Sequence, residues 1–213
     1  MIKLLSLLSL LSLIVTLALP VAARPFEECV AEAPFGALPA SKKQRTVKLC
    51  RKAYAVEYDP NAKLPIWVSY TLAPSETVGC LSRSDSFARD PDLTDEQAST
   101  PQDYLKSGYD MGHMANNSDM RWDAVAERES FLMTNMTPQL PNFNRGVWKK
   151  LEDSTRGWAL SRQHPMHIYV GPIYDRDQDP RIGKSGGDEI RVNTPGGIRE
   201  FEIVEISVPE GED

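Results

Sequence analysis

The chain has 213 residues, of which 41% are hydrophobic and 25% charged, and its formal net charge at pH 7 is −6. This length supplies one domain with a sizeable core, and we expect no second full domain beside it. The charge excludes a uniformly basic surface, but residues 175–213 hold 11 acidic and only 5 basic side chains, so residues 24–174 are close to neutral and can still carry a local basic groove.

The first 23 residues have the pattern of a secretory signal peptide. They carry a single charge at Lys3, an apolar run from Leu4 to Leu19, a break at Pro20 and small residues up to Ala23. The alternative is a membrane anchor, but this run is interrupted by hydroxyl side chains and is shorter than the roughly 20 apolar residues that a spanning helix needs. We therefore expect cleavage after Ala23, a secreted or periplasmic protein, and no stable membrane association afterwards.

Three cysteines, Cys29, Cys50 and Cys80, would lie in this exported chain, where disulfides persist. Three pairings are possible. We favour Cys29 with Cys50, which would attach the N-terminal segment to the domain and leave Cys80 free. The chain has no Cys-x-x-Cys motif, so a structural zinc site is not supported.

The first half of the domain predicts a short antiparallel sheet. Residues 24–45 are polar and broken by Pro and Gly, which predicts an extended arm. The segments 51–58 and 66–72 are rich in β-branched and aromatic residues, and turn-forming residues lie between them, so we expect two paired strands. Residues 73–108 are loop-like, and so long an irregular stretch usually serves a function.

The second half predicts a strand, a helix and another strand. Phe131–Met136 is a short apolar run that ends before Pro138 and is interpreted as a strand. Asn142–Arg162 contains no proline and has apolar residues at helical spacing, which makes it the best helix in the chain. Met166–Val170 returns to strand character. Together the elements indicate an α+β fold with an antiparallel sheet core.

Three polar residues within 40 positions could carry hydrolytic chemistry: His113, Asn144 and Glu152. A histidine has a pKa of about 6.5 and can accept a proton from water near neutral pH. Asn144 and Glu152 are eight residues apart on the predicted helix, a little over two turns, so both can face one side. An amide oxygen and a carboxylate, completed by waters, suit Mg²⁺.

Each of these residues also has an ordinary structural interpretation. A histidine after Gly112, which would let the backbone turn sharply or approach a phosphate closely, can be a loop residue. Asn144 can be a helix cap, and Glu152 can belong to a solvated helix face with its basic neighbours. Spacing alone leaves these alternatives open.

The order of several motifs resembles a known family. These motifs are Asp103-Tyr104, Ser107-Gly108-Tyr109, Asp110-Met111-Gly112-His113-Met114-Ala115, Asn135-Met136-Thr137-Pro138-Gln139, and Asn144-x-x-x-Trp148-x-x-Leu151-Glu152. In this order they resemble the sugar-non-specific DNA/RNA endonucleases of the ββα-metal (His-Me finger) superfamily, the Serratia nuclease and endonuclease G type. The resemblance covers about Tyr54 to Tyr174 and implies a ββα-metal finger motif.

The resemblance implies a role for each matching residue. His113 would be the general base, Asn144 the direct ligand of Mg²⁺ (with Mn²⁺ as the alternative), and Glu152 an acidic group that holds water of the hydration shell. Arg156 would contact phosphate, and Asn135 would be an active-site amide. Asp110 would support the loop that aims His113. Independently of the resemblance, Arg145 on the same helix could contact phosphate without reading base sequence.

The chain departs from the family at Met111, where the pattern usually has arginine. A lost guanidinium removes a bidentate phosphate contact. Arg83 and Arg89, in the loop before the motif, are the expected substitutes. DNA and RNA would be the substrates, cut with little sequence preference to leave 5′-phosphate ends. The alternative is a catalytically impaired, nucleic-acid-binding relative of the same fold.

The family normally continues past Gly171-Pro172 with further core strands and an aromatic-rich run, and this run is absent from residues 175–213. We assign residues 24–174 to the nuclease domain and 175–213 to a divergent hairpin with an acidic tail. Part of this segment, 182–206, resembles the last hairpin of Gre-type transcript-cleavage factors, but a plain β-hairpin that completes or replaces nuclease strands fits as well. Biological role and oligomeric state are not indicated by the sequence.

Overall fold

The computed structural model describes residues 24–32, 45–172, 201–202 and 206–207. The predicted signal peptide and most of the predicted C-terminal segment lie outside these residues. No helix within the described ranges combines the length and apolar character needed to cross a bilayer.

The main sheet is antiparallel and has the order β1-β2-β3-β6-β7, with β8 also paired to β6. Its strands are β1 (Val47–Cys50), β2 (Ala55–Asp59), β3 (Leu64–Leu72), β6 (Met166–Pro172), β7 (Phe201–Glu202) and β8 (Ile206–Ser207). The predicted pairing of the segments 51–58 and 66–72 is confirmed by the register of β2 with β3. β1 was not predicted, because its four residues mix exposed Lys48 with buried Leu49 and Cys50 and carry little strand signal.

Two short C-terminal strands extend the sheet beyond β6. Glu202 pairs with Gly171, and Ile206 pairs with Ile168, both antiparallel. β7 and β8 therefore pair with successive parts of β6 and extend the sheet by one further edge. The division of the chain into a nuclease domain at 24–174 and a divergent segment at 175–213 stays a prediction.

A second, two-stranded sheet carries the Asp-Met-Gly-His motif. β4 (Asp110–His113) pairs antiparallel with β5 (Met136–Gln139), and His113 is opposite Met136. Two short helices, α2 (Asn117–Met120) and α3 (Ala124–Glu129), connect the strands. The remaining short elements of the described chain are η1 (Phe26–Glu32), η3 (Pro74–Val78), α1 (Pro101–Tyr104) and η4 (Met133–Asn135).

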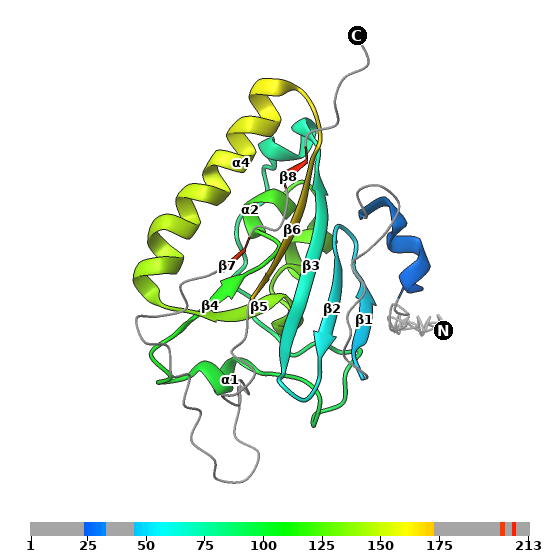
Figure 1. The fold of residues 1–213 in the computed structure, drawn as a ribbon, viewed down its shortest axis with the longest axis vertical. Coiled ribbons are helices and arrows are strands. Elements are labelled where there is room, and N and C mark those ends of the chain that lie inside the picture. Colours follow the sequence, from blue (N-terminus) through cyan, green and yellow to red (C-terminus); the bar gives the residue numbers. More distant parts are fainter. Residues whose placement is uncertain (1–23, 33–44, 173–200, 203–205, 208–213) are drawn as a thin grey trace, which may run out of the picture.

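The long helix α4 (Lys149–Arg162) follows a π-helical segment, η5 (Phe143–Trp148). The predicted helix 142–162 is thus confirmed, although its first turns are wider than an α-helix. It ends at Gln163, which adopts a left-handed conformation with φ of 56°. α4 lies along one side of the sheet, with β4 and β5 beside its N-terminal part (Figure 1). The order β4, β5, α4 is the predicted ββα arrangement.

The prediction of a strand at Phe131–Met136 was wrong in its bounds. The structure has the 3₁₀ helix η4 there, and the strand β5 begins only at Met136. Nearly every side chain of this run is buried. The run is therefore apolar because it forms a buried turn, and it lacks the alternating faces of a half-buried strand. The predicted extended arm is also partly helical, because η1 occupies Phe26–Glu32.

Apolar side chains pack on both faces of the main sheet. The larger cluster, which includes Val56, Tyr58, Val68 and Tyr70 from the strands, also contains Ala159 of α4. The opposite face carries a smaller cluster of Cys29, Cys50, Ala55 and Trp67, against which η1 packs. Figure 1 shows η1 and α4 on opposite sides of the sheet.

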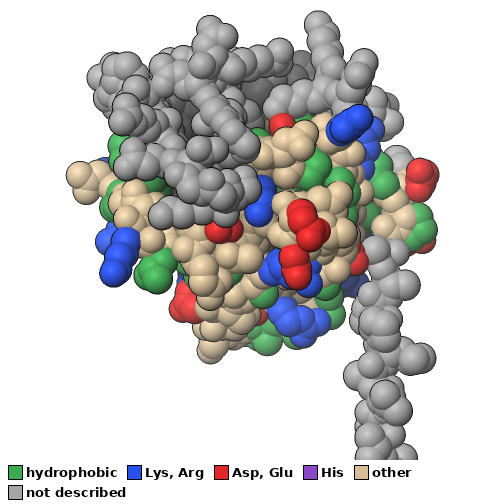
Figure 2. All heavy atoms as spheres, turned by 90° about the horizontal axis from the view of Figure 1, so that it is seen from below, with side chains coloured by type: hydrophobic (Ala, Val, Ile, Leu, Met, Phe, Trp, Pro, Cys, Tyr) green, Lys and Arg blue, Asp and Glu red, His purple; other side chains and the backbone are tan. Residues whose placement is uncertain are grey.

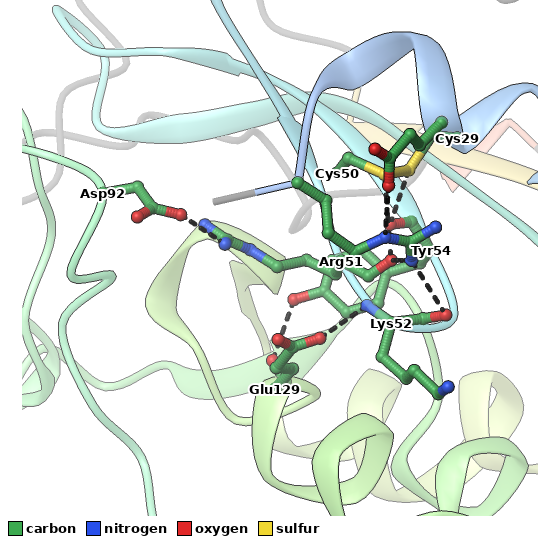
Figure 3. Close-up of a disulfide and its surroundings, with 9 residues drawn as sticks. Cys29, Cys50, Arg51, Lys52, Tyr54, Asp92 and Glu129 are labelled. Carbon is green, nitrogen blue, oxygen red and sulfur yellow. Dashed lines mark hydrogen bonds and ion pairs between the residues drawn. A yellow bond between two sulfur atoms is a disulfide. The ribbon is translucent and has the colours of Figure 1, made fainter. Parts of the chain in front are cut away.

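The favoured disulfide is present. Cys29 and Cys50 are joined, and Cys80 is free and exposed. The bond fastens η1 to the strand β1. The next residue, Arg51, pairs with the buried Asp90 (2.5 Å) and with the partly exposed Asp92 (2.5 Å). Figure 3 shows the disulfide and the pair of Arg51 with Asp92. The N-terminal edge of the sheet is therefore fixed both covalently and electrostatically.

Replacing Cys29 and Cys50 by serine is expected to lower the free energy of unfolding by about 3 kcal/mol, because the unfolded chain regains the freedom of the closed loop. Thermal unfolding of this variant, compared with the oxidised and the reduced wild type, measures the loss. Cys80→Ser is the matched control and should leave the melting temperature unchanged. An equal loss in the control would show that the effect is not due to the crosslink.

Candidate active site

A cleft of about 250 Å³ opens between the β4–β5 sheet, the π-helical segment and the start of α4. Its wall contains four basic side chains, two carboxylates, one histidine and two amides. The lining residues are Arg83, Met111, His113, Asn116, Ser118, Asn144, Arg145, Lys149, Glu152, Asp153 and Arg156. On the face of the molecule shown in Figure 2, basic and acidic side chains are intermixed.

His113 ends β4 and is only 8% exposed. Its imidazole packs against Phe131, with ring centroids 5.2 Å apart, and against Phe87 at 5.7 Å. Burial, with a smaller contribution from the positive charge of Arg83, lowers the pKa of His113 to about 3, and only Asp85 opposes this shift. The side chain is therefore a neutral imidazole at physiological pH. Its Nε2 atom is buried and has no hydrogen-bond partner among the described residues.

Gly112 has a different role from the one its sequence position suggests. It lies within β4, and its φ is not in the left-handed region, which Gly108 alone of the described glycines adopts. A Cβ atom at Gly112 would collide with the buried side chain of Gln139 on β5. The glycine makes room for this side chain and does not create a sharp turn.

Asn144, in the π-helical segment η5, is held by Asp110 at the start of β4. The amide nitrogen of Asn144 donates to Asp110 Oδ2 at 3.0 Å. Asp110 also accepts two hydrogen bonds from Arg145, from Nε at 2.8 Å and from Nη2 at 2.7 Å. Because the amide nitrogen is used in this way, the amide oxygen of Asn144 remains for a cation.

The carboxylate of Asp110 stays ionised. Burial alone would raise its pKa, but the hydrogen bonds from Arg145 and Asn144, together with the charge of Arg145, bring the pKa below its ordinary value. Asp110 was expected to support the loop that aims His113. The structure shows its carboxylate bonded to Asn144 and Arg145, and the expected supporting role stays a prediction.

Glu152 lies two turns along the helix from Asn144 and is half-buried in the cleft wall. Burial and then the negative charge of Asp119 raise the pKa of Glu152 to about 8, and Arg156 opposes the shift. Glu152 and the buried Asp119 both have raised pKa values, so a nearby cation would favour the ionised forms of both groups.

Asp119 was not predicted as a site residue. It lies on α2, is 1% exposed, and accepts hydrogen bonds from Tyr70 Oη at 2.8 Å and from Arg156 Nη1 at 2.9 Å. Its pKa is raised to about 6 by burial, against the hydrogen bonds that it accepts. In the sequence Asp119 lies six residues after His113 and belongs to no motif that would single it out. It meets Arg156 only because the fold places α2 beside α4.

The structure brings most of the predicted site residues together. His113, Asn144, Arg145, Glu152, Arg156 and Arg83 all line the cleft. Two predicted residues do not. Arg89 hydrogen-bonds to the carbonyl oxygens of Leu93 and Asp90 and pairs with Asp95, so it is engaged in its own loop.

Asn135 is fully buried and away from the cleft wall. Its Oδ1 accepts from the Ala115 amide at 2.8 Å, and its Nδ2 donates to the Ala115 and Ser130 carbonyl oxygens, each at 2.9 Å. The amide thus fixes the backbone directly after His113 and Met114. It shapes the site without contacting the cleft.

The donor set fits a hydrated divalent cation better than a fully protein-bound one. No group of three or more His, Cys, Asp or Glu side chains in the described residues could enclose a metal ion. One free amide oxygen on Asn144 and one carboxylate on Glu152 leave most of the coordination positions to water, as Mg²⁺ prefers.

Comparison with known proteins gives consistent results. Residues 33–209 match the family described as DNA/RNA non-specific endonuclease. Over 125 residues the chain is 31% identical to the mitochondrial endonuclease G of Homo sapiens, covering 58% of this chain and 42% of that protein. Over 140 residues it is 34% identical to a nuclease of Nostoc sp., covering 65% of this chain and 50% of that one. The chain therefore spans half or less of the length of these relatives.

Among solved structures, a chain from the EndoG/EndoGI complex is similar, with a TM-score of 0.56 and 29% sequence identity, over 60% of this chain and 53% of that chain. This similarity supports the α+β class expected from the sequence.

Proposed function

The chain belongs to the DNA/RNA non-specific endonuclease family, and from this premise we propose that it is a secreted, Mg²⁺-dependent enzyme that hydrolyses phosphodiester bonds of DNA and RNA with little sequence preference. The observation that carries the proposal is the neutral, buried imidazole of His113 in one cleft with the oriented amide of Asn144 and the carboxylate of Glu152. Secretion rests on the signal-peptide pattern of residues 1–23.

In this proposal His113 takes the proton from the attacking water, because its imidazole is neutral and packed in a fixed orientation by two phenylalanines. The oxygen of that water forms the new bond to phosphorus, and the bond from phosphorus to the 3′ oxygen breaks. The phosphate stays on the 5′ side. A cation held by Asn144 and, through water, by Glu152 would neutralise charge on the phosphate and on the departing oxygen.

The basic residues of the cleft bind the phosphate. Arg156 is oriented by the buried Asp119 and by Asp153, so little side-chain freedom is lost when it meets an anion. Arg83 lines the cleft beside His113, whereas Met111 lines it with an apolar side chain that also packs against the cluster containing Leu64 and Met136. We assign to Arg83 the phosphate contact that Met111 cannot make.

The test is digestion of a supercoiled plasmid and of a structured RNA with Mg²⁺, with EDTA, and with EDTA followed by excess Mg²⁺. We expect both substrates to be cut with Mg²⁺, both to survive in EDTA, and activity to return. Product ends should accept a label only after treatment with phosphatase, as 5′-phosphates do. Binding of both substrates without cleavage would instead favour the impaired, nucleic-acid-binding alternative.

A further inference from the structure

The imidazole of His113 forms a cluster with two phenylalanine rings and the guanidinium of Arg83. The imidazole is nearly perpendicular to the Phe131 ring, with an interplanar angle of 84°. Phe131 is also perpendicular to Phe87, at 86° and a centroid distance of 4.9 Å. The guanidinium carbon of Arg83 lies over the Phe131 ring, 5.0 Å from its centroid. Phe131 is therefore the one residue of this group that contacts all the others.

The backbone fixes the group in place. Phe131 is fully buried directly after α3, and its carbonyl oxygen accepts from the Ala88 amide at 3.2 Å. The Met133 amide donates to the Ala88 carbonyl oxygen at 2.9 Å. The loop that carries Arg83 and Phe87 is thus bonded to the segment that carries Phe131.

Arg83 has little else to orient it. Its side chain is 46% exposed, and its Nε pairs with Asp85 at 2.5 Å. Neither of its η nitrogens hydrogen-bonds to another residue in the described part of the chain. By contrast, the η nitrogens of Arg156 are both bound by carboxylates. A face-on aromatic ring attracts a cation through its quadrupole and leaves the outer nitrogens free for an anion.

We propose that Phe131 is a positioning residue, whose ring holds the His113 imidazole and the Arg83 guanidinium at a fixed separation so that both meet the same phosphate of a bound nucleic acid. This inference rests on the proposed function. It explains how a chain with Met111 in the motif can place a cation next to the base from a different loop.

Phe131→Leu removes the ring but keeps an apolar side chain, and Phe87→Leu is the matched control. Phe87 also contacts the imidazole, but the guanidinium of Arg83 lies over the ring of Phe131. Both rings pack on the imidazole, and burial lowers its pKa. Either variant should therefore raise the midpoint of the His113 titration, measured by NMR of the imidazole protons. Arg83 and Asp85 are the charged groups that act on this imidazole, and both variants retain them.

The decisive measurement is the affinity for a short DNA duplex in EDTA at low ionic strength, which needs no turnover. Loss of the ring should weaken binding by about two- to fivefold, the range for a partly exposed cation over an aromatic ring. In an Arg83→Gln background the same Phe131→Leu change should have no further effect, because the cation that the ring orients is gone. Phe87→Leu should leave the affinity of both backgrounds unchanged.

Equal weakening by Phe131→Leu in both backgrounds would overturn the proposal, and so would a wild-type chain without measurable affinity for the duplex. If Phe131→Leu does not fold, as judged by its thermal unfolding, Phe131→Met fills a similar volume without an aromatic face and takes its place. A chain that binds as expected but does not cut DNA with Mg²⁺ refutes the proposed hydrolysis and leaves the role of Phe131 standing.

Discussion

Replacing His113 by alanine is expected to lower kcat for DNA and for RNA by about two to four orders of magnitude, the usual contribution of a positioned general base. The affinity for nucleic acid should change little, because the basic side chains of the cleft make the phosphate contacts and keep their partners. Initial rates under saturating substrate and Mg²⁺ measure the loss. A variant that cuts as fast as wild type would remove His113 from the mechanism.

His167→Ala provides the matched control for this experiment. His167 lies on β6, where its Nδ1 is hydrogen-bonded to Thr71 at 2.9 Å, and it does not line the cleft. Its replacement should leave kcat close to wild type. Equal losses in the two variants would point to a general effect of histidine removal on folding.

The pH dependence follows from the lowered pKa of His113. An imidazole with a pKa near 3 is unprotonated throughout the neutral and mildly acidic range, so the acid limb of kcat/KM should lie below pH 5. The same group affects stability: as pH falls below about 6.5 the unfolded chain binds a proton at His113 that the folded chain does not bind, so the free energy of unfolding declines toward pH 3. His113→Ala should abolish this part of the decline, which urea unfolding at several pH values measures.

Elements with strong local signals were predictable, and those defined by tertiary contacts were not. The strand β3 and the helix α4 show clear β-branched and helical patterns, and both were found. β1 and the turn before β5 depend on what covers them, because a short buried segment has no periodicity to distinguish strand from 3₁₀ helix.

The candidate site shows the same division. His113, Asn144 and Glu152 were identified by ordered motifs and spacing along one helix. Asp119 was missed, and Asn135 was predicted as an active-site amide although its side chain bonds to buried backbone groups. An acid or an amide has the same letter in the sequence whether it contacts a ligand or satisfies buried groups. Which of these two roles it has is decided by the direction of the side chain, and that depends on the packing of α2 against α4 and of β4 against β5.

The second large effect is expected from Asp110. Asp110→Ala removes the acceptor that fixes the amide of Asn144, so that amide can rotate and present nitrogen instead of oxygen to the cation site. Outer partners of metal ligands typically contribute 10- to 100-fold to metal affinity or activity. We therefore expect the Mg²⁺ concentration for half-maximal activity to rise by about that factor.

Arg145→Gln separates this effect from the ion pair that Asp110 also forms. It removes the two hydrogen bonds from the guanidinium but keeps the bond between Asp110 and Asn144. Arg145 is 72% exposed, and its pairing with Asp110 is expected to contribute little to stability. Arg145→Gln should therefore leave the Mg²⁺ requirement near wild type and raise KM for nucleic acid, since one phosphate contact is lost. If the two variants shift the Mg²⁺ requirement equally, the ion pair between Asp110 and Arg145 orients the site. If only Asp110→Ala shifts it, Asp110 acts on the metal site through the orientation of the Asn144 amide.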